Sequence, residues 1–404
     1  MLIELHGGQF ANRGARKMLE VTVQELSARL PGARFALDAC VGTAEERAGF
    51  ETLLWRRGWM GGRFFRPGLA LQIAASAALA PVAARSFGHV PLGRVDALVD
   101  LAGFSYTDQW GPRPTEDFAR LAEWYRARGK PVILLPQALG PFETPRTRAA
   151  FARTAAAADV IYARDGVSLS HARRAAPGAG TLALCPDMTL PVGVERVAAA
   201  PDAPLILVPN VRMLDQGGRD EGAYLSLLEA AARAAAAEAR PVRIVVHDAR
   251  GEDRALAAAL AGRLADLPGF GADAAAAIVE EADPLALKRI LSRAALVVGS
   301  RFHALVAALS CGVPCLGIGW SHKYDELMRD LDCAGAMLGP GEGPGEMAAR
   351  VRAALAPGAN AAARARIAAA ADRRIAELDR MWADVAARLA AGVGAGAGAG
   401  GAAG

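Results

Sequence analysis

An arginine and a histidine stand close together at the expected start of a helix, in the stretch 299–304. An apolar run ends there in Gly-Ser, and a helical pattern follows it. The start of a helix presents backbone N–H groups and the positive end of the helix dipole, which both favour a bound anion. Ser300 suits the N-cap, Arg301 can bind a phosphate or carboxylate through two hydrogen bonds, and His303 can transfer a proton near neutral pH. This combination predicts a catalytic site that holds an anion and moves a proton.

A second group of polar residues follows the next predicted strand, 314–318. Residues 320–324 read Trp-Ser-His-Lys-Tyr, so His322 and Lys323 come directly after that strand. Neighbouring strands of a parallel sheet lie about 5 Å apart, and their carboxyl ends meet at one edge. We therefore expect His322 and Lys323 to share a site with Arg301. His322 is equally suitable as a helix N-cap, so its catalytic role stays open.

Further candidate ligand-binding residues follow other predicted strands. Asn210 and Arg212 come after the strand 205–209, and Arg212 would bring a second cation to the site. Gln137 follows the strand 132–136, where it could donate a hydrogen bond to a hydroxyl-rich ligand. Such positions at strand ends are where open parallel sheets bind ligands.

At two further strand ends, the polar residues have either a ligand-binding role or a purely structural one. Gly8 and Asn12 follow the strand 2–6, in a stretch without the dinucleotide fingerprint or the lysine-containing phosphate loop, so it is either a ligand contact or a plain tight turn. Arg164 follows the strand 160–163. It either faces the ligand or pairs with Asp165, which, like Ser168, also suits the cap of the next helix.

The elements that must position these residues alternate between short apolar strands and helices. This pattern predicts parallel sheets covered on both faces. We expect an α/β fold of two Rossmann-like domains that face a cleft, with an acceptor domain at 1–192, a linker at 191–204, and a donor domain at 203–390. The glycine- and alanine-rich tail 391–404 is expected to be disordered. The predicted strands are 2–6, 34–37, 97–101, 132–136, 160–163, 205–209, 242–247, 276–279, 295–298 and 314–318.

Composition excludes several classes of function. A net charge of +4 over 404 residues argues against a dedicated nucleic-acid binder, which would carry a concentrated basic face. The five cysteines are odd in number and scattered, so they do not suggest a disulfide framework. Cys311 and Cys315 lie four apart, but no further ligands at suitable spacing complete a zinc site. We therefore expect neither a structural metal nor a nucleic-acid partner.

The location of the protein is predicted from three further segments. The first six residues lack the basic flank and apolar block of a signal peptide, so we expect a cytoplasmic protein. The stretch 69–82 is apolar but too short to span a bilayer. Aromatic residues and arginines interleave at 55–66, which fits either an ordered loop before a buried helix or peripheral contact with the inner face of the cell membrane.

On these residues and motifs, the chain resembles the polysaccharide pyruvyl transferase family from Gly7 to about Cys333. The most specific matching stretches are 299–304 and 312–324. The resemblance implies a two-domain fold similar to the B-type glycosyltransferases. Less specific matches lie at 7–15, 97–111, 136–142, 158–168, 186–187 and 208–212.

The resemblance also implies the reaction. Members of this family transfer the enolpyruvyl group of phosphoenolpyruvate to a sugar, often one that is lipid-linked or part of a polymer, and usually form a cyclic pyruvate ketal. Arg301 and His303 would then lie in the phosphoenolpyruvate site, with Arg212 as a second cationic contact. Phosphoenolpyruvate is a co-substrate, and we expect no cofactor. A nucleotide-sugar glycosyltransferase or epimerase of the same architecture, and a catalytically silent glycan-binding relative, remain alternatives.

Overall fold

The computed structural model of this chain describes residues 1–10, 12–54, 89–191, 193–247, 251–268, 270, 277–321 and 323–399. Two compact units make up the chain. Unit 1 contains Met1–Phe10, Ala15–Met188 and Glu377–Gly404, and unit 2 contains Ala11–Gly14 and Thr189–Ala376. Each unit is built on its own parallel sheet, so the predicted α/β class is confirmed.

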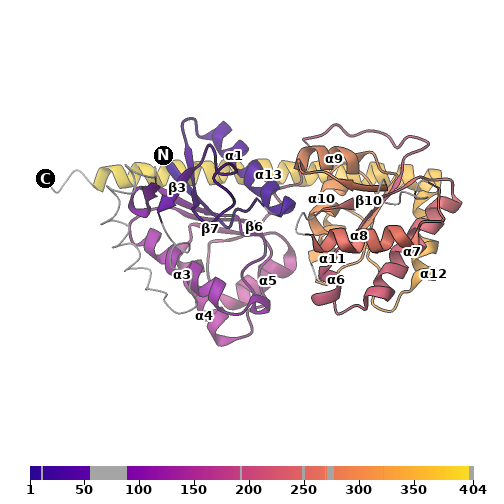
Figure 1. Ribbon diagram of the computed structural model, residues 1–404. Helices are drawn as coiled ribbons and strands as arrows, with labels where there is room; N and C mark the ends of the chain where they lie inside the picture. Colours follow the sequence, from indigo (N-terminus) through magenta and orange to yellow (C-terminus); the bar gives the residue numbers. More distant parts are fainter. Residues whose placement is uncertain are drawn as a thin grey trace. The chain divides into compact units, whose positions relative to one another are not determined.

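The sheet of unit 1 has eight parallel strands in the order β4-β3-β2-β1-β5-β6-β7-β8. Figure 1 shows α3, α4 and α5 on one face of this sheet and α1 on the other. β5 and β6 are buried along their whole length, which explains why they read as apolar runs. The elements are β1 Leu2–His6, α1 Arg13–Arg29, β2 Arg34–Asp38, β3 Glu51–Leu54, β4 His89–Pro91, β5 Ala97–Asp100, α3 Arg113–Arg126, β6 Val132–Gln137, α4 Pro145–Ala157, β7 Val160–Ala163, α5 Gly166–Ala175 and β8 Leu182–Leu184, with short 3₁₀ turns η1 at Leu92–Arg94 and η2 at Asp108–Trp110.

The sheet of unit 2 has five parallel strands in the order β11-β10-β9-β12-β13. In Figure 1, α9 and α10 cover one face, and α7, α8 and α12 cover the other. The core of this unit is made mainly of aliphatic side chains from the strands and from α7, α8 and α12, together with Tyr224 and Phe270. Its elements are β9 Leu205–Val208, α6 Arg212–Asp215, α7 Glu221–Ala237, β10 Val242–Val246, α8 Glu252–Arg263, β11 Ile278–Glu280, α9 Pro284–Ser292, β12 Leu296–Gly299, α10 Phe302–Ser310, β13 Cys315–Gly317, α11 Lys323–Asp330, α12 Pro344–Leu355 and α13 Pro357–Ala399.

Helix α13 changes the predicted domain division. We expected residues up to 390 in the second domain, but the chain from Glu377 onward belongs to unit 1. Trp382 of this part is 1% exposed, Tyr162 of β7 donates a hydrogen bond to Asp384, and Arg388 donates one to the Asp159 carbonyl (3.1 Å). These contacts explain why the last part of α13 packs with the first unit.

The predicted linker and tail differ from the structure as well. The long segment of unit 2 begins at Thr189, ahead of the expected linker, and Lys288 of α9 donates a hydrogen bond to the Pro191 carbonyl (2.9 Å). Helix α13 continues to Ala399, so it extends into the stretch that we expected to be disordered.

The membrane-related segments of the sequence cannot be compared with the structure, because 55–66 and 69–82 lie outside the described residues. Within the part of the chain that is described, no helix has both the length and the apolar character needed to cross a bilayer.

Candidate active site

The candidate residues of unit 2 lie where the order of its sheet reverses. β9 and β12 are neighbours, with β10 and β11 on one side and β13 on the other. Gly299 at the end of β12 pairs with Val208 at the end of β9, and a side chain at Gly299 would stand 3.0 Å from the Val208 Cβ. Ser300 follows Gly299 directly, and Asn210 follows Val208 after Pro209. Ligands of open parallel sheets bind beside the carboxyl ends of the strands at such a switch point.

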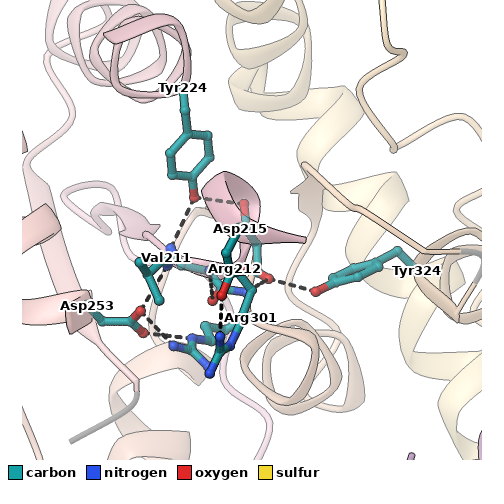
Figure 2. Close-up of polar contacts among 9 residues, drawn as sticks. Val211, Arg212, Asp215, Tyr224, Asp253, Arg301 and Tyr324 are labelled. Carbon is teal, nitrogen blue, oxygen red and sulfur yellow. Dashed lines mark hydrogen bonds and ion pairs between the residues drawn. The ribbon is translucent and has the colours of Figure 1, made fainter. Parts of the chain in front are cut away.

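Four side chains hold the backbone at this switch point (Figure 2). Asn210 Nδ2 and the Tyr324 hydroxyl both donate to the Ser300 carbonyl, at 2.7 and 2.8 Å. The Tyr224 hydroxyl donates to Ser300 Oγ (2.8 Å) and accepts from the Asn210 N–H (3.1 Å). All four residues are at most 2% exposed. Burial raises the pKa of Tyr224, so its hydroxyl keeps the proton that it donates.

Ser300 therefore has a different role from the predicted one. The N-cap of α10 is Arg301, and no side chain caps the helix. The Ser300 hydroxyl instead accepts the hydrogen bond from Tyr224. Ser300 joins β12 to α7 and α11, and so fixes the backbone from which Arg301 and His303 project.

Arg301 forms a bidentate ion pair with Asp253, which sequence reasoning missed. Arg301 Nε and Nη2 each lie 2.6 Å from a carboxylate oxygen of Asp253. The Arg301 side chain is 12% exposed and that of Asp253 is fully buried. Asp253 also accepts from the Val211 N–H at 3.0 Å (Figure 2). The carboxylate thus connects the first turn of α8 to both loops of the switch point and sets the plane of the guanidinium.

A charge argument could have found Asp253 in the sequence. A buried arginine needs an acid nearby. Asp253 stands at the start of a helix that follows a predicted strand of the same sheet, so it belongs to the same edge as Arg301.

The other basic candidates of unit 2 lie around this network. The Arg212 N–H donates to Asn210 Oδ1 (3.0 Å), and its side chain, 37% exposed, pairs with Asp215. Lys323 Nζ lies 4.5 Å from the centre of the Trp320 ring and 5.5 Å from that of Phe302, which follows Arg301 directly. The sheet pairing of β12 with β13 that we used to place Lys323 near Arg301 is confirmed.

His303 is the second residue of α10 and is partly exposed. Its ring packs edge-to-face with that of Phe302, with centroids 5.4 Å apart and an interplanar angle of 88°. This contact restrains the imidazole at the start of the helix. His322 lies outside the described residues, so its predicted place in the site stays a prediction.

In unit 1, two predicted ligand-binding side chains make internal contacts. Gln137 is fully buried, and its Nε2 donates to Asp100 at 2.7 Å. Arg164, 5% exposed, forms an ion pair with buried Asp187 at 3.0 Å. Asp165, the partner that we considered for Arg164, caps α5 by accepting from the Ser168 N–H (2.7 Å), as its alternative role predicted.

The two candidates Gly8 and Asn12 lie between β1 and α1, Gly8 in unit 1 and Asn12 in unit 2. Gly8 is buried, and a side chain there would stand 3.2 Å from Leu19, so close packing explains the glycine. Asn12 is partly exposed just before α1. Neither position is tested as a ligand contact by this geometry.

The sequence comparison decides the family. The profile of the polysaccharide pyruvyl transferases matches residues 64–322, a range that includes Asn210, Asp253 and Arg301 of the switch point. The chain belongs to the polysaccharide pyruvyl transferase family. The expected family is thus confirmed, and this family member is a transferase of polysaccharide biosynthesis. A comparison with curated protein sequences gave no match.

Solved structures extend the likeness to the fold of nearly the whole chain. A putative UDP-N-acetylglucosamine 2-epimerase from Listeria monocytogenes is 14% identical with a TM-score of 0.56, covering 95% of this chain and 97% of its own. HepE from Anabaena, in complex with UDP and glucose, is 14% identical with a TM-score of 0.57, covering 95% and 98%. The UDP-GlcNAc 2-epimerase from Neisseria meningitidis is 11% identical with a TM-score of 0.55, covering 94% and 100%. At such identities the likeness shows the fold, which is that of the B-type glycosyltransferases and related epimerases.

Proposed function

We propose that this family member transfers the enolpyruvyl group of phosphoenolpyruvate to a sugar of a cell-envelope or extracellular polysaccharide, or of its lipid-linked precursor. The product is a pyruvate ketal, and phosphate is released. The observation that carries the proposal is the cationic switch point of unit 2, where Arg301 is held in one orientation by Asp253 and by a buried hydrogen-bond network. It lies within the range that matches the family.

Phosphoenolpyruvate carries a phosphate and a carboxylate, so two cationic contacts are expected. Arg301 supplies the first, and its pairing with Asp253 fixes the guanidinium before the substrate arrives. Arg212 is our candidate for the second, because its side chain is half-exposed and its backbone is tied to Asn210. Lys323 adds a third positive charge beside Phe302.

The chemistry requires a proton at the methylene carbon of phosphoenolpyruvate. His303 is our candidate for the acid that delivers it, which leaves an oxocarbenium-like centre at the adjacent carbon. One sugar hydroxyl forms a bond to that carbon, the bond from carbon to the phosphate oxygen breaks, and a second hydroxyl closes the ketal ring. Of the two hydroxyl protons, one balances the proton added to the methylene carbon and the other leaves with phosphate.

Two similar structures support a saccharide as the second substrate. HepE was solved with UDP and glucose, and the epimerase from Neisseria meningitidis with UDP-GlcNAc. The fold of this chain is therefore one that holds sugars in other proteins. We place the acceptor on unit 1 and the enzyme in the cytoplasm, in contact with the inner face of the membrane when the acceptor is lipid-linked.

The decisive experiment incubates the protein with phosphoenolpyruvate and a panel of p-nitrophenyl glycosides of galactose, glucose, mannose and N-acetylglucosamine. We expect acceptor-dependent release of phosphate together with the mass increase of a pyruvate ketal on one glycoside. A parallel incubation with UDP-sugars tests the alternative, a nucleotide-sugar transferase or epimerase. Release of UDP or epimerised sugar, without phosphate release from phosphoenolpyruvate, would overturn the proposal.

A further inference from the structure

A histidine and a buried aspartate meet at the switch point of the unit 1 sheet. β1 and β5 are neighbours, and the strand order runs outward from them, through β2 to β4 on one side and β6 to β8 on the other. His6 is the last residue of β1 and pairs in register with Asp100, the last residue of β5. This is the position where an open parallel sheet binds its ligand.

The side chain of Asp100 contacts His6 and is itself held in place by two other side chains. Asp100 is fully buried, and its Oδ1 lies 2.6 Å from His6 Nδ1. The Tyr106 hydroxyl donates to the same oxygen (3.0 Å), and Gln137 Nε2 donates to Oδ2 (2.7 Å). Three hydrogen bonds thus give both oxygens of this buried side chain a partner and fix its orientation.

These contacts also decide which imidazole nitrogen can accept a proton. An ionised carboxylate can only accept hydrogen bonds, so His6 Nδ1 carries the hydrogen and Nε2 carries the lone pair. No described residue forms a hydrogen bond with His6 Nε2. The His6 side chain is 28% exposed whereas Asp100 is fully buried, so a ligand in solution can reach the base but not its orienting acid.

The backbone and a neighbouring ring hold the imidazole in place. The His6 ring packs against Phe118 of α3, with centroids 5.1 Å apart. Gly7 follows with φ +80°, and a side chain there would stand 2.6 Å from the Ala102 backbone. The loops that follow β1 and β5 therefore approach each other closely beside His6. An imidazole oriented by a buried carboxylate is the arrangement that enzymes use to remove a proton from a hydroxyl.

We propose that His6 is a general base of this enzyme and removes the proton from a hydroxyl of the saccharide acceptor, with Asp100 as its positioning residue. The inference rests on the proposed function, because it assigns the acceptor-side step of that reaction. The hydroxyl O–H bond breaks, its electron pair forms the new bond to the carbon of phosphoenolpyruvate, and the proton moves to His6 Nε2. The Asp100 carboxylate stabilises the imidazolium until solvent takes up the proton.

The first test compares His6→Gln with His89→Gln, which changes a histidine on the edge strand β4. His6→Gln should lower kcat by about 10²- to 10⁴-fold, while calorimetry gives an unchanged Kd for phosphoenolpyruvate. Added imidazole should restore part of the rate to His6→Ala, and Asp100→Asn should lower kcat without such rescue. His89→Gln should keep the wild-type rate. Wild-type turnover in His6→Gln would overturn the role of His6.

The second test uses the wild-type protein and so does not depend on how the variants fold. Diethyl pyrocarbonate modifies exposed imidazole, and His6 is the single histidine of the tryptic peptide 1–13. A reactive p-nitrophenyl glycoside should protect His6 from modification, as read by peptide mass spectrometry, and phosphoenolpyruvate alone should not. Unchanged modification at saturating glycoside would contradict the proposal. If no glycoside releases phosphate from phosphoenolpyruvate in the wild type, the proposed function fails instead.

Discussion

At the scale of single residues, the switch point of unit 2 depends on polar contacts between distant parts of the chain. Arg301 and Asp253 are 48 positions apart, and Asn210 and Ser300 are 90 apart. The motif around Arg301 could be recognised from neighbouring residue types. The residues next to Arg301 do not reveal its partner, which follows only from the argument that a buried arginine needs an acid at the same edge of the sheet.

Replacement of His303 by alanine should abolish most of the pyruvyl transfer. If His303 delivers the proton to the methylene carbon, kcat should fall by about 10²- to 10⁴-fold. The Kd for phosphoenolpyruvate should change little, since the cationic contacts remain. Phosphate-release kinetics and calorimetry measure the two quantities. A His303→Ala protein with the wild-type kcat would remove the residue from the mechanism.

Replacement of Asp253 by asparagine should affect both stability and donor binding. The change leaves the largely buried Arg301 without its carboxylate, which costs about 3–5 kcal/mol of unfolding free energy when a buried pair is broken. The guanidinium would also lose its fixed orientation, so the affinity for phosphoenolpyruvate should fall. Urea unfolding and calorimetry measure these effects.

Glu280→Gln provides a control for the Asp253 variant. It breaks an exposed ion pair to Arg254 of the same helix, α8. Exposed pairs contribute little, so both measurements should stay as in the wild type. Equal stability of Asp253→Asn and Glu280→Gln would contradict the importance of the buried pair.

At the scale of elements, the sequence predicted the central strands better than the edges. β5, β6, β9 and β12 are buried on both faces, so their apolar runs stand out. β3, β4 and β8 were missed. β4 and β8 lie at the edges of the unit 1 sheet and are not fully buried, and β3 begins with two polar residues, so no clear apolar run marks these strands. For the site, the sequence predicted the edge of the sheet at which the polar residues lie. It did not predict that Gln137 and Arg164 contact acids from other parts of the chain.

Tyr324 anchors α11 to the switch point and offers a test at this scale. Tyr324→Phe keeps the ring that packs against Phe302 but removes the donor to the Ser300 carbonyl. We expect a loss of about 1–2 kcal/mol in unfolding free energy and a weaker affinity for phosphoenolpyruvate. Chemical unfolding and calorimetry would show both. Unchanged values would mean that Asn210 alone holds this carbonyl.

At the scale of the whole molecule, buried thiols make stability depend on pH in both units. Burial raises the pKa of Cys185 in unit 1 and of Cys333 in unit 2 to about 12, from 9.0. Between these values the unfolded chain loses the thiol protons while the folded chain keeps them. The free energy of unfolding should therefore fall as pH rises above about 9. Urea unfolding from pH 8 to 11 measures the slope, which should be shallower in the Cys185→Ala, Cys333→Ala double variant; an equal slope would contradict the prediction.

The two parts of α13 should respond differently to mutation. Trp382→Ala removes a side chain that is 1% exposed in the part of the helix assigned to unit 1, at a cost of about 3–5 kcal/mol. Hydrogen exchange should quicken in β6 and β7 while β9 and β12 stay protected. Arg380→Ala, at an exposed position of the same helix, is the control. Faster exchange confined to unit 2 would contradict the division.

The assignment of Glu377–Gly404 to unit 1 also bears on how the chain is made. A ribosome synthesises unit 2 completely before it reaches the helical segment that completes unit 1. The N-terminal unit therefore emerges first but acquires its final buried side chains, such as Trp382 and Leu389, last. Until the ribosome has made this helical segment, the apolar surface of unit 1 that packs against these side chains stays exposed. We therefore expect nascent chains to need a chaperone at unit 1.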